Sequence, residues 1–500
     1  MRVSDLQAGT RDQASQPDRL RAALRRFHEL YGPGAVSVLR APARINILGE
    51  HVDYVSYLPT ASLPFGSREH EMLMLFRATD DGQVSGASMN DGFPPFSFAL
   101  DEEAVEDQSK QGQAKQSWES FVFSRPAPAP HWGNYVKGAV QFARWKFGAS
   151  VGRGFRFLVD STIPPKSGAS SSSALVALSG AAIRHVNQID FELEELARDS
   201  SQAEWYPGTR GGALDHTAIC LARRGHAVHI SHCDGEVKLI PLPDSDFRWI
   251  TFFTHEADKG RDAMLEYNER AAVSRLLIPA VIDDLKRNYA AFDQAWAEAL
   301  FKLKRDVSAA CDEIEALLGL IPDALPLGGF ALLDPAIFRE CETAFPALAH
   351  DRRDRPLKLR DRALHHLGEM RRVAQAVARL KDASGDSQIE LAIHTLGALG
   401  GLINESHESL RERYEVSTPE VERLVEIVRA DPGTYGARLM GGGFGGNVLV
   451  LTAAENTQAL IDRAQAEFYG PRGRDGLSEG SVMISTPGDG LAMLEPDRIP

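Results

Sequence analysis

The chain has 500 residues, of which 43% are hydrophobic and 25% are charged, and its formal net charge at pH 7 is −14. This length predicts two domains, and the composition is ordinary for a globular protein. The negative charge disfavours nucleic acid or an anionic membrane as a partner, and no segment approaches the roughly 20 apolar residues that a membrane span needs. We therefore expect a small-molecule partner, no nucleic acid and no membrane; the sequence leaves the oligomeric state open, with a monomer as the default.

The cysteines and the N-terminal segment both predict a cytoplasmic protein. Cys220, Cys233, Cys311 and Cys341 are scattered and form neither a CxxC pair nor a disulfide framework. The segment "MRVSDLQAGTRDQASQPDRL" contains no apolar stretch of the kind that a secretory signal requires.

The first half of the chain predicts a mixture of helices and strands. A helix should start near Asp18, because apolar residues recur at helical spacing from there to Gly32. Strands are predicted at 36–40 and 44–49, and "GFRFLVD" at 154–160 alternates like a half-buried strand. The polar segment 101–130 should be a surface excursion, and a helix should run from Ala174.

Prolines in "LIPLPDSD", at 239–246, mark a break in the chain. Beyond the break we expect a strand, "FRWITFF", then mostly helices from about residue 262, and finally a strand at 447–452. The break predicts two domains, residues 1–245 and residues 246–500.

The stretch "IPPKSGASSSSALVAL", at 163–178, places short polar side chains between a predicted strand and a predicted helix. Serines at such a turn can cap the helix while its free N–H groups attract phosphate. Gly168 would let the backbone approach a ligand closely, and a serine hydroxyl could complete the ligand shell of Mg²⁺. The alternative is a plain helix cap with spare serines, and this segment alone favours neither interpretation.

A second polar cluster lies in "APARINILGEHVDY", at 41–54, around a strand end and the turn after it. Its carboxylates could bind hydroxyl groups, although composition alone favours a salt-bridged surface turn. A third segment, "AEWYPGTRGGALDHTA", carries Glu204 and Asp215, which could divide metal binding and proton transfer between them. Two acids in a loop do not by themselves establish a site.

The glycines of "GGGFGG", at 441–446, would let the backbone pack tightly against a ligand or another loop. A flexible turn is the common alternative, but the strand directly behind this run favours an ordered role.

Two histidine groups could be mistaken for sites. "GHAVHISHC", at 225–233, looks like a zinc cluster, but residues three apart on a strand point to opposite faces, so His226 and His229 should not converge. His365 and His366 lie in a helical run, where we expect packing and solvent contact. No GxxxxGK[ST] motif occurs, so a P-loop nucleotide site is not predicted.

In their order along the chain, the segments 41–54, 163–178 and 437–451 resemble the three signature motifs of the GHMP kinase superfamily, and more narrowly those of its galactokinase branch. "HWGNYVKG", "LEYNER" and "LINESHESLRERYEVSTPEVERLV" are also similar to galactokinase segments. The resemblance implies an α+β, two-domain GHMP kinase fold. Its N-terminal domain would be like ribosomal protein S5 domain 2 and its C-terminal domain ferredoxin-like, with the active site in the cleft between them.

The resemblance also implies an activity, an ATP-dependent kinase that phosphorylates galactose or a close relative, usually at the anomeric C1 hydroxyl. Asp215 would accept the proton of the sugar hydroxyl, and Arg44 would stabilise the transition state and keep Asp215 ionised. The sugar would be bound by Glu50, His51, Asp53 and Tyr267.

ATP and Mg²⁺ would be bound by the phosphate-binding motif and its neighbours. The residues implied for ATP are Ser88, Lys166, Ser167, Gly168, Ala169, Ser170, Ser171 and Ser172. Those implied for Mg²⁺ are Ser172 and Glu204. Phosphoryl transfer asks the protein mainly for positioning and charge neutralisation, so a phosphate loop, a metal and one base would suffice.

Several positions depart from the pattern of the branch. After Tyr54 the sequence reads "VSYLPTASLPFG", where galactokinases have a longer, glycine-bearing loop close to the sugar. His216 and Asn447 stand where the family has glutamine and cysteine, and the interval from Glu204 to Asp215 is closer to N-acetylgalactosamine kinases. The exact sugar therefore stays open.

Two alternatives follow from these departures. One is a kinase for a related sugar such as N-acetylgalactosamine, galacturonate, arabinose or a heptose. The other is a non-catalytic sensor of sugar and ATP. Catalysis is favoured, because the chain contains all the residues that the resemblance implies for it: Asp215, Arg44, Ser172 and Glu204.

Overall fold

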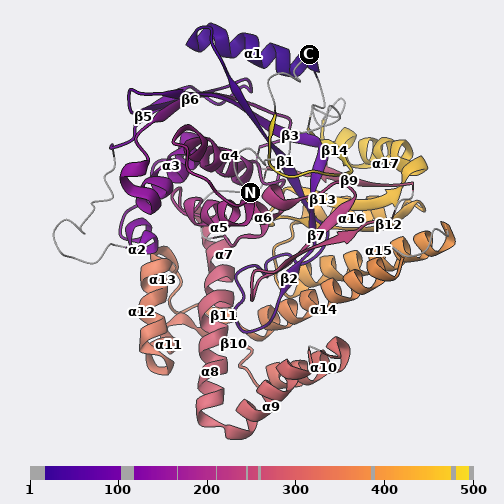
Figure 1. Ribbon diagram of the computed structural model, residues 1–500. Helices are drawn as coiled ribbons and strands as arrows, with labels where there is room; N and C mark the ends of the chain where they lie inside the picture. Colours follow the sequence, from indigo (N-terminus) through magenta and orange to yellow (C-terminus); the bar gives the residue numbers. More distant parts are fainter. Residues whose placement is uncertain are drawn as a thin grey trace.

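The computed structural model describes residues 17–102, 117–165, 167–209, 211–243, 246–256, 261–303, 305–383, 389–473 and 480–494. Among these residues, no helix is long and apolar enough to cross a membrane. Figure 1 shows the two larger β-sheets in the upper part of the molecule and helices α8, α9 and α10 extending away from them at the lower end.

The N-terminal sheet has the strand order β16-β1-β3-β6-β4-β5, with β15 beside β3 and β4 parallel to β6. Its strands are β1 (Ser37–Asn46), β3 (Pro64–Thr79), β4 (Gln83–Ser88), β5 (Phe96–Ala99), β6 (Gly154–Ser161), β15 (Pro487–Gly488) and β16 (Ala492–Leu494). The two strands predicted at 36–40 and 44–49 form one strand, β1, which ends at Asn46. Its register against β3 shifts between Pro42 and Arg44, and this irregularity accommodates a proline that has no N–H for the ladder.

Helices pack on this sheet and on one another. They are α1 (Pro17–Tyr31), α2 (Trp118–Phe123), α3 (Gly133–Phe147), η4 (Gly148–Ser150), α4 (Ser171–Val186), α5 (Leu193–Ala203) and α6 (Leu214–Leu221). The helices predicted near Asp18 and Ala174 are confirmed as α1 and α4. Helix α1 ends as expected at Gly32, which has a φ of 79° and donates its N–H to the carbonyl of His28 at 2.9 Å.

Part of the segment predicted as a surface excursion is packed. Residues 103–116 lie outside the described residues, but 118–123 form helix α2. Trp118 is 1% exposed, and its indole N–H donates to the carbonyl of Gln202 at 2.8 Å. Burial of one large aromatic ring outweighs the polar composition of its surroundings.

The C-terminal sheet has the order β12-β13-β9-β14. Its strands are β9 (Phe247–Phe253), β12 (Thr434–Met440), β13 (Asn447–Ala453) and β14 (Val482–Ser485). Helices α15 (Ile389–Glu412) and α16 (Pro419–Arg429) precede β12, and η6 (Ala454–Asn456), α17 (Thr457–Ala464), η7 (Gln465–Tyr469) and η8 (Gly470–Arg472) follow β13. Strand, helix, two strands, helix and strand in this order give the expected ferredoxin-like arrangement.

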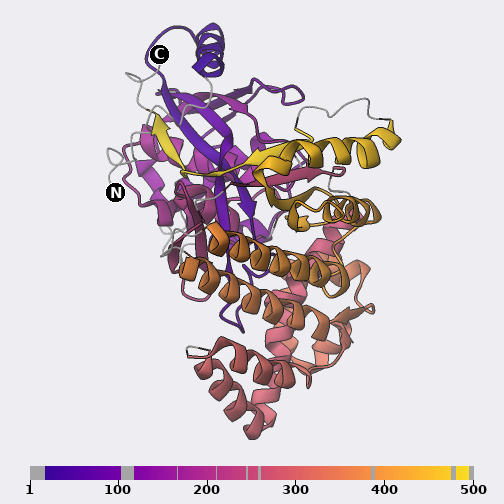
Figure 2. The ribbon, with the colours of Figure 1, turned by 90° about the vertical axis from the view of Figure 1, so that its right-hand side faces the viewer.

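A helical region is inserted between β9 and α15. It contains α7 (Arg261–Ala272), η5 (Val273–Leu277), α8 (Ile278–Asn288), α9 (Ala290–Lys302), α10 (Val307–Leu318), α11 (Leu327–Leu333), α12 (Pro335–Ala344), α13 (Pro346–Asp351), α14 (Arg360–Ala383) and a two-stranded sheet of β10 (Ala324–Pro326) and β11 (Pro356–Lys358). Figure 2 shows α14 and α15 side by side. The turn after the first signature segment enters the core of this region, because Tyr54, Val55, Tyr57 and Leu58 are buried there.

A small sheet, β2-β7-β8, contains β2 (Ala61–Ser62), β7 (His226–Ser231) and β8 (Val237–Pro241). The last described strands, β15 and β16, pair with β3 and β1 and so return to the N-terminal sheet. The division of the chain at residues 245 and 246 stays a prediction.

Candidate active site

One cavity brings together segments that are far apart in the sequence. Its lining includes the side chains of Arg44, Glu50, His51, Asp53, Glu204, Asp215 and Tyr267, all of which the sequence singled out. Ser173, at the start of α4, and Gly442, in the run after β12, also line it. The cavity therefore lies where β1, the loops around α4 and α6, helix α7 and the glycine run meet.

Arg44 and Asp215 form an ion pair in this cavity. Nε and Nη2 of Arg44 lie 2.7 and 2.6 Å from Oδ1 of Asp215, and Nη1 donates to the carbonyl of Gly168 at 3.2 Å. The Arg44 side chain is 5% exposed and that of Asp215 is 30% exposed. Burial opposes the charge of Arg44, but the carboxylate of Asp215 helps to outweigh it and the pKa of Arg44 is raised. The result is a fixed cation beside a carboxylate that solvent or a ligand can reach.

Asp53 is held against the start of helix α6. The backbone N–H of Leu214 is hydrogen-bonded to its carboxylate, and a Cβ at Gly212 would lie 2.3 Å from its Oδ2. The loop before α6 thus has room for glycine only, and the first turn of the helix places Asp215 next to Asp53. Burial, and then the charge of Asp215, raises the pKa of Asp53 to about 6.

Glu50 connects the first signature segment to the end of β12. Its Oε2 lies 2.9 Å from Nη2 of Arg438 and accepts the N–H of Gly441 at 3.1 Å. Burial opposes ionisation, but Arg438 and Arg44 outweigh it and lower the pKa of Glu50 to about 2. Glu50 is therefore ionised and shared between the cavity wall and the C-terminal sheet.

His51 adopts a positive φ of 58°, which directs its ring into the cavity wall. Its Nδ1 lies 3.1 Å from the hydroxyl of Tyr54, whereas its Nε2 is buried without a partner among the described residues. Burial lowers the pKa of His51 to about 4, so the ring is neutral at physiological pH.

The serine segment forms the predicted strand-to-helix turn. Ser170 precedes α4 with a φ of 62°, and no described side chain caps the helix. Its hydroxyl is buried without a partner among the described residues. The plain-cap interpretation is therefore not what the structure shows, because no described side chain bonds to the first N–H groups of α4.

The glycine run is ordered and packs on this turn. Gly168 and Gly441 have φ values of 85° and 93°, and a Cβ on Gly441 would lie 3.1 Å from the Cα of Gly168. A Cβ on Gly446 would lie 3.2 Å from the carbonyl oxygen of Ser167. The prediction of a close backbone approach to another loop is confirmed.

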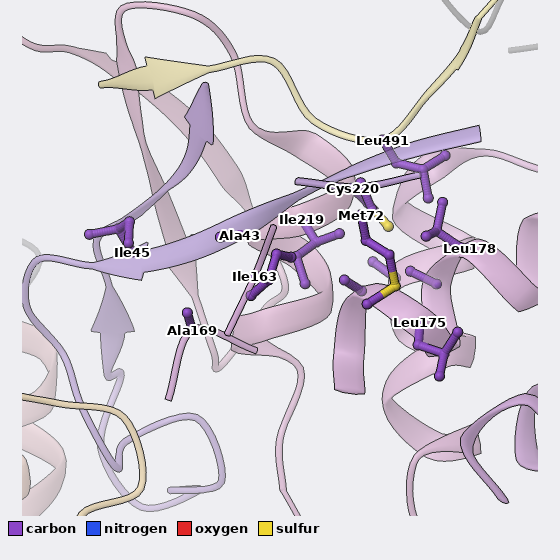
Figure 3. Close-up of a cluster of buried hydrophobic side chains, with 14 of the residues drawn as sticks. Ala43, Ile45, Met72, Ile163, Ala169, Leu175, Leu178, Ile219, Cys220 and Leu491 are labelled. Atoms are coloured by element: carbon purple, nitrogen blue, oxygen red, sulfur yellow. The ribbon is translucent and has the colours of Figure 1, made fainter. Parts of the chain in front are cut away.

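A hydrophobic cluster fixes both ends of the serine turn (Figure 3). Ile163 lies before the turn and Ala169 within it, and both are buried with Leu175 and Leu178 of α4. Ile45 of β1 belongs to the same cluster, so the strand that carries Arg44 and the turn share one core. The N–H of Arg44 also donates to the carbonyl of Ala169 at 3.2 Å.

Glu204 lies at the end of α5 and faces the start of α4. Its Oε2 accepts the Ser173 hydroxyl at 2.7 Å and lies 2.7 Å from Nε2 of His216, and Ser172 is hydrogen-bonded to its carboxylate. Burial opposes ionisation, but these partners lower the pKa of Glu204 overall. The adjacent pair of carboxylate and serine hydroxyl suits Mg²⁺, which takes few protein ligands beside phosphate oxygens.

Among the described residues, none of the eight predicted for the nucleotide site is among those that line this cavity. Ser88 ends β4, where its hydroxyl accepts the N–H of Asn90 at 3.0 Å, and it is not among the lining residues. Lys166 lies outside the described residues. Ser167 uses its hydroxyl within the turn, donating to the carbonyl of Pro164 at 2.8 Å.

The histidines of 225–233 and the pair His365 and His366 lie in different environments. No group of metal-ligating side chains was found among the described residues, and His232 instead lies 2.8 Å from the Ser62 hydroxyl. The expectation of solvent contact for His365 and His366 is wrong, because both are 0% exposed. Helix α14 is buried on this face by the signature turn, and Nε2 of His365 lies 3.1 Å from the carbonyl oxygen of Glu50.

Sequence reasoning missed several residues that shape the site. Arg438 and Glu369 hold the signature turn, since Glu369 accepts the N–H of Gly49 at 2.8 Å. Tyr414 packs on His51 with ring centroids 4.7 Å apart. One local signal could have identified Arg438. It is a charged residue within the apolar strand "ARLM", and a charged side chain in such a strand is usually paired with an opposite charge when it is buried.

Comparisons with known proteins agree with this geometry. The model "GHMP kinases N terminal domain" matches residues 134–223, "GHMP kinases C terminal" matches 388–470, and "Galactokinase galactose-binding signature" matches 25–61. These matches and the observed fold show a two-domain GHMP kinase fold with the N-terminal and C-terminal domains of that superfamily.

The chain is also similar to galactokinases over most of its length. It is 29% identical to galactokinase of Bos taurus over 463 residues, covering 92% of this chain and 94% of that protein. It is 28% identical to galactokinase of Homo sapiens over 452 residues, covering 90% and 92%. The solved galactokinase of Lactococcus lactis, complexed with galactose, superposes with a TM-score of 0.65 at 22% identity and covers 95% of this chain and 99% of its own.

Proposed function

We propose that this protein transfers the γ-phosphoryl group of ATP to the anomeric hydroxyl of galactose or a close relative. The relatives named above are galactokinases, and one solved relative holds galactose. The observation that carries the proposal is the ion pair of Arg44 and Asp215. It lies in one cavity with the signature turn, and Arg44 also donates to the carbonyl of Gly168 in the serine turn.

Asp215 is the general base in this proposal. A carboxylate is a weak base for a sugar hydroxyl, so the negative charge that develops on the reacting oxygen must be stabilised by a nearby cation. Arg44 supplies that cation at 2.6 Å from the carboxylate, and its bond to the carbonyl of Gly168 ties the base to the phosphate-binding turn. The base and the phosphate-binding turn are thus held at a fixed position relative to each other.

The serine turn and α4 would bind the ATP phosphates. The uncapped N–H groups of α4 and the unpartnered hydroxyl of Ser170 are donors that lack an acceptor among the described residues. Gly168 lets the backbone approach the phosphates, and the glycine run supports the turn from behind. Lys166 and Ser88 remain predicted members of the nucleotide site.

Ser172 and Glu204 would hold Mg²⁺, which neutralises phosphate charge when it is bound. Their hydrogen bond places a hydroxyl and an ionised carboxylate together at the start of α4. The sugar would be bound by Glu50, His51, Asp53 and Tyr267, which line the same cavity as Asp215. We also propose a cytoplasmic location, which the free state of all four cysteines supports.

The test is ADP release from Mg·ATP across a panel containing galactose, N-acetylgalactosamine, galacturonate, arabinose and a heptose. We expect release with galactose or one of its relatives, and no release when EDTA replaces Mg²⁺. Asp215→Asn should lower kcat by about a thousandfold or more while ATP still binds, because the variant keeps the shape of the site and loses the base.

Glu236→Gln, at an exposed residue of the hairpin between β7 and β8, is the matched control and should keep normal turnover. Near-normal turnover by Asp215→Asn would remove the general-base assignment. Sugar-dependent thermal stabilisation without ADP release from any sugar would instead identify a sensor of sugar and ATP.

A further inference from the structure

A continuous chain of buried hydrogen bonds links the turn after the signature segment to the cavity. The hydroxyl of Tyr57 lies 2.6 Å from Nδ1 of His366, and Nε2 of His366 lies 3.1 Å from Oγ of Ser274. The Ser274 hydroxyl lies 3.1 Å from that of Tyr414, which lies 2.9 Å from that of Tyr54. Tyr54 completes the chain at Nδ1 of His51, and all six residues are at most 9% exposed.

The members of this chain come from distant segments. Tyr57 belongs to the shortened turn "VSYLP", Ser274 to η5, His366 to α14, and Tyr414 to the segment after α15. The turn that departs from the galactokinase pattern is therefore connected to the sugar-binding histidine through the helical region, and not through a direct contact.

The Tyr57 end of this hydrogen-bond chain determines which group donates in each hydrogen bond. Burial lowers the pKa of His366 well below its usual range and that of His51 to about 4, so each ring is neutral and carries a single N–H. Among the described residues, the Tyr57 hydroxyl has no acceptor except Nδ1 of His366. It therefore donates there, His366 donates from Nε2 to Ser274, and each following hydroxyl donates to the next.

At the other end, Nδ1 of His51 accepts from Tyr54, and the single proton of the ring must be on Nε2. That atom is buried, has no partner among the described residues, and belongs to a side chain that lines the cavity. The reverse order would leave the Tyr57 hydroxyl without an acceptor and would present a lone pair of His51 to the ligand.

Building on the proposed kinase function, we propose that Tyr57, His366 and Ser274 are positioning residues that fix His51 as an Nε2–H donor toward an oxygen of the sugar. A donor at this position needs a lone pair on the ligand. The Nε2–H group therefore favours a ligand with a hydroxyl or an acetamido oxygen at this point. It disfavours a protonated amino group, which has no lone pair. The chain thus selects neutral sugars over cationic amino sugars.

The first test is the tautomer of His51, read from long-range ¹H–¹⁵N correlations of protein labelled with ¹⁵N-histidine. The wild-type protein should show His51 in the Nε2–H form. Tyr57→Phe removes only the first donor, so a population of the Nδ1–H form should appear. Tyr469→Phe is the matched control, because it removes an equally buried hydroxyl, bonded at 2.8 Å to the carbonyl of Phe253, that is not part of the chain.

An Nδ1–H ring in the wild-type protein, or an unchanged Nε2–H ring in Tyr57→Phe, would overturn the proposal. If Tyr57→Phe does not fold, Ser274→Ala breaks the same chain at its centre and is read in the same way. This measurement needs no turnover, so it stands even where the kinase assay fails.

The second test is steady-state kinetics with the sugar that the wild-type protein uses. Tyr57→Phe and Ser274→Ala should each raise the KM for the sugar about three- to tenfold, with the KM for ATP and kcat within about twofold. The double variant should resemble either single variant, because one broken bond already frees the whole chain. Equal losses in kcat and in the use of both substrates would indicate a merely structural role and would reject the proposal.

Discussion

Asp53 carries a charge in the cavity at the expense of the stability of the fold. Its carboxylate lies among Asp215, the tight Gly212 backbone and the start of α6, and its pKa is raised to about 6. A sugar hydroxyl needs the ionised form as an acceptor. The folded protein therefore keeps a carboxylate ionised at neutral pH in a place that favours the neutral form.

Asp53→Asn should stabilise the ligand-free protein at neutral pH. A carboxyl group with a raised folded-state pKa stabilises the fold at pH values below its unfolded pKa, and this contribution is lost as the pH rises through about 6. Between pH 4 and pH 7 the wild-type protein should lose up to about 3 kcal/mol relative to the variant. Urea unfolding of both proteins at these pH values measures the difference.

Asp91→Asn, at an exposed residue, is the control for the removal of a carboxylate far from the cavity. A difference in unfolding free energy between wild type and Asp53→Asn that does not change with pH would contradict the expected ionisation of Asp53.

Among the elements, the contact between the serine turn and the glycine run decides the shape of the phosphate site. Both backbones have positive φ at the contact, and a Cβ on Gly168 or Gly441 would lie 3.0 or 3.1 Å from the backbone of the other segment. The pairing of β12 with β13 positions the run, and the core of α4 and β1 positions the turn.

Gly441→Ala should lower stability by about 2 kcal/mol and raise the KM for ATP severalfold, since its Cβ would press on the backbone of Gly168 and the φ is strained. Gly82→Ala is the matched control, because Gly82 has a φ of 68° but nothing within 4 Å of an added Cβ. It should show the backbone strain alone, with an unchanged KM for ATP. Chemical unfolding and ATP titrations separate the two effects, and equal losses in both variants would refute the packing argument.

The whole molecule is held together at the cavity by ionic contacts between its two halves. Glu50 and Arg438 are 6% and 0% exposed, and Arg438 also donates to the carbonyls of Ile47 and Asn46 at 2.9 and 2.6 Å. The signature turn of the first half is thus fixed to strand β12 of the C-terminal sheet.

Arg438→Met should lower the unfolding free energy by about 3–5 kcal/mol, because it leaves the carboxylate of Glu50 buried without its main partner. The double variant Glu50→Gln/Arg438→Met should lose less than the sum of the two single variants, since it removes both charges. Arg423→Met breaks a pair whose partners are 57% and 70% exposed, and should change stability by less than about 1 kcal/mol. Additive losses at Glu50 and Arg438 would mean that the pair is not coupled.

Much of this organisation could be predicted from local patterns. Helical periodicity and a glycine stop predicted helix α1, and alternation of apolar residues predicted strand β6. The order of three motifs was sufficient to predict the resemblance to the superfamily. The polar composition of 101–130 gave a wrong expectation for α2, because one tryptophan that finds a pocket outweighs its neighbours. His365 and His366 were misjudged because the signature turn covers α14 from more than three hundred residues away, as the separation of 315 between Glu50 and His365 shows.

The residues that can do chemistry could be identified from local motifs alone: Arg44, Asp215, Glu204, the serine turn and the signature turn have residue types that limit what they can bind. Only the tertiary structure decided how they are presented. The charge of Glu50, the acidity of Asp53 and the proton position on His51 depend on burial and on partners such as Arg438 and His366, which are distant in sequence. Burial and proximity set a pKa and a hydrogen-bond direction, and neither can be read from a linear pattern.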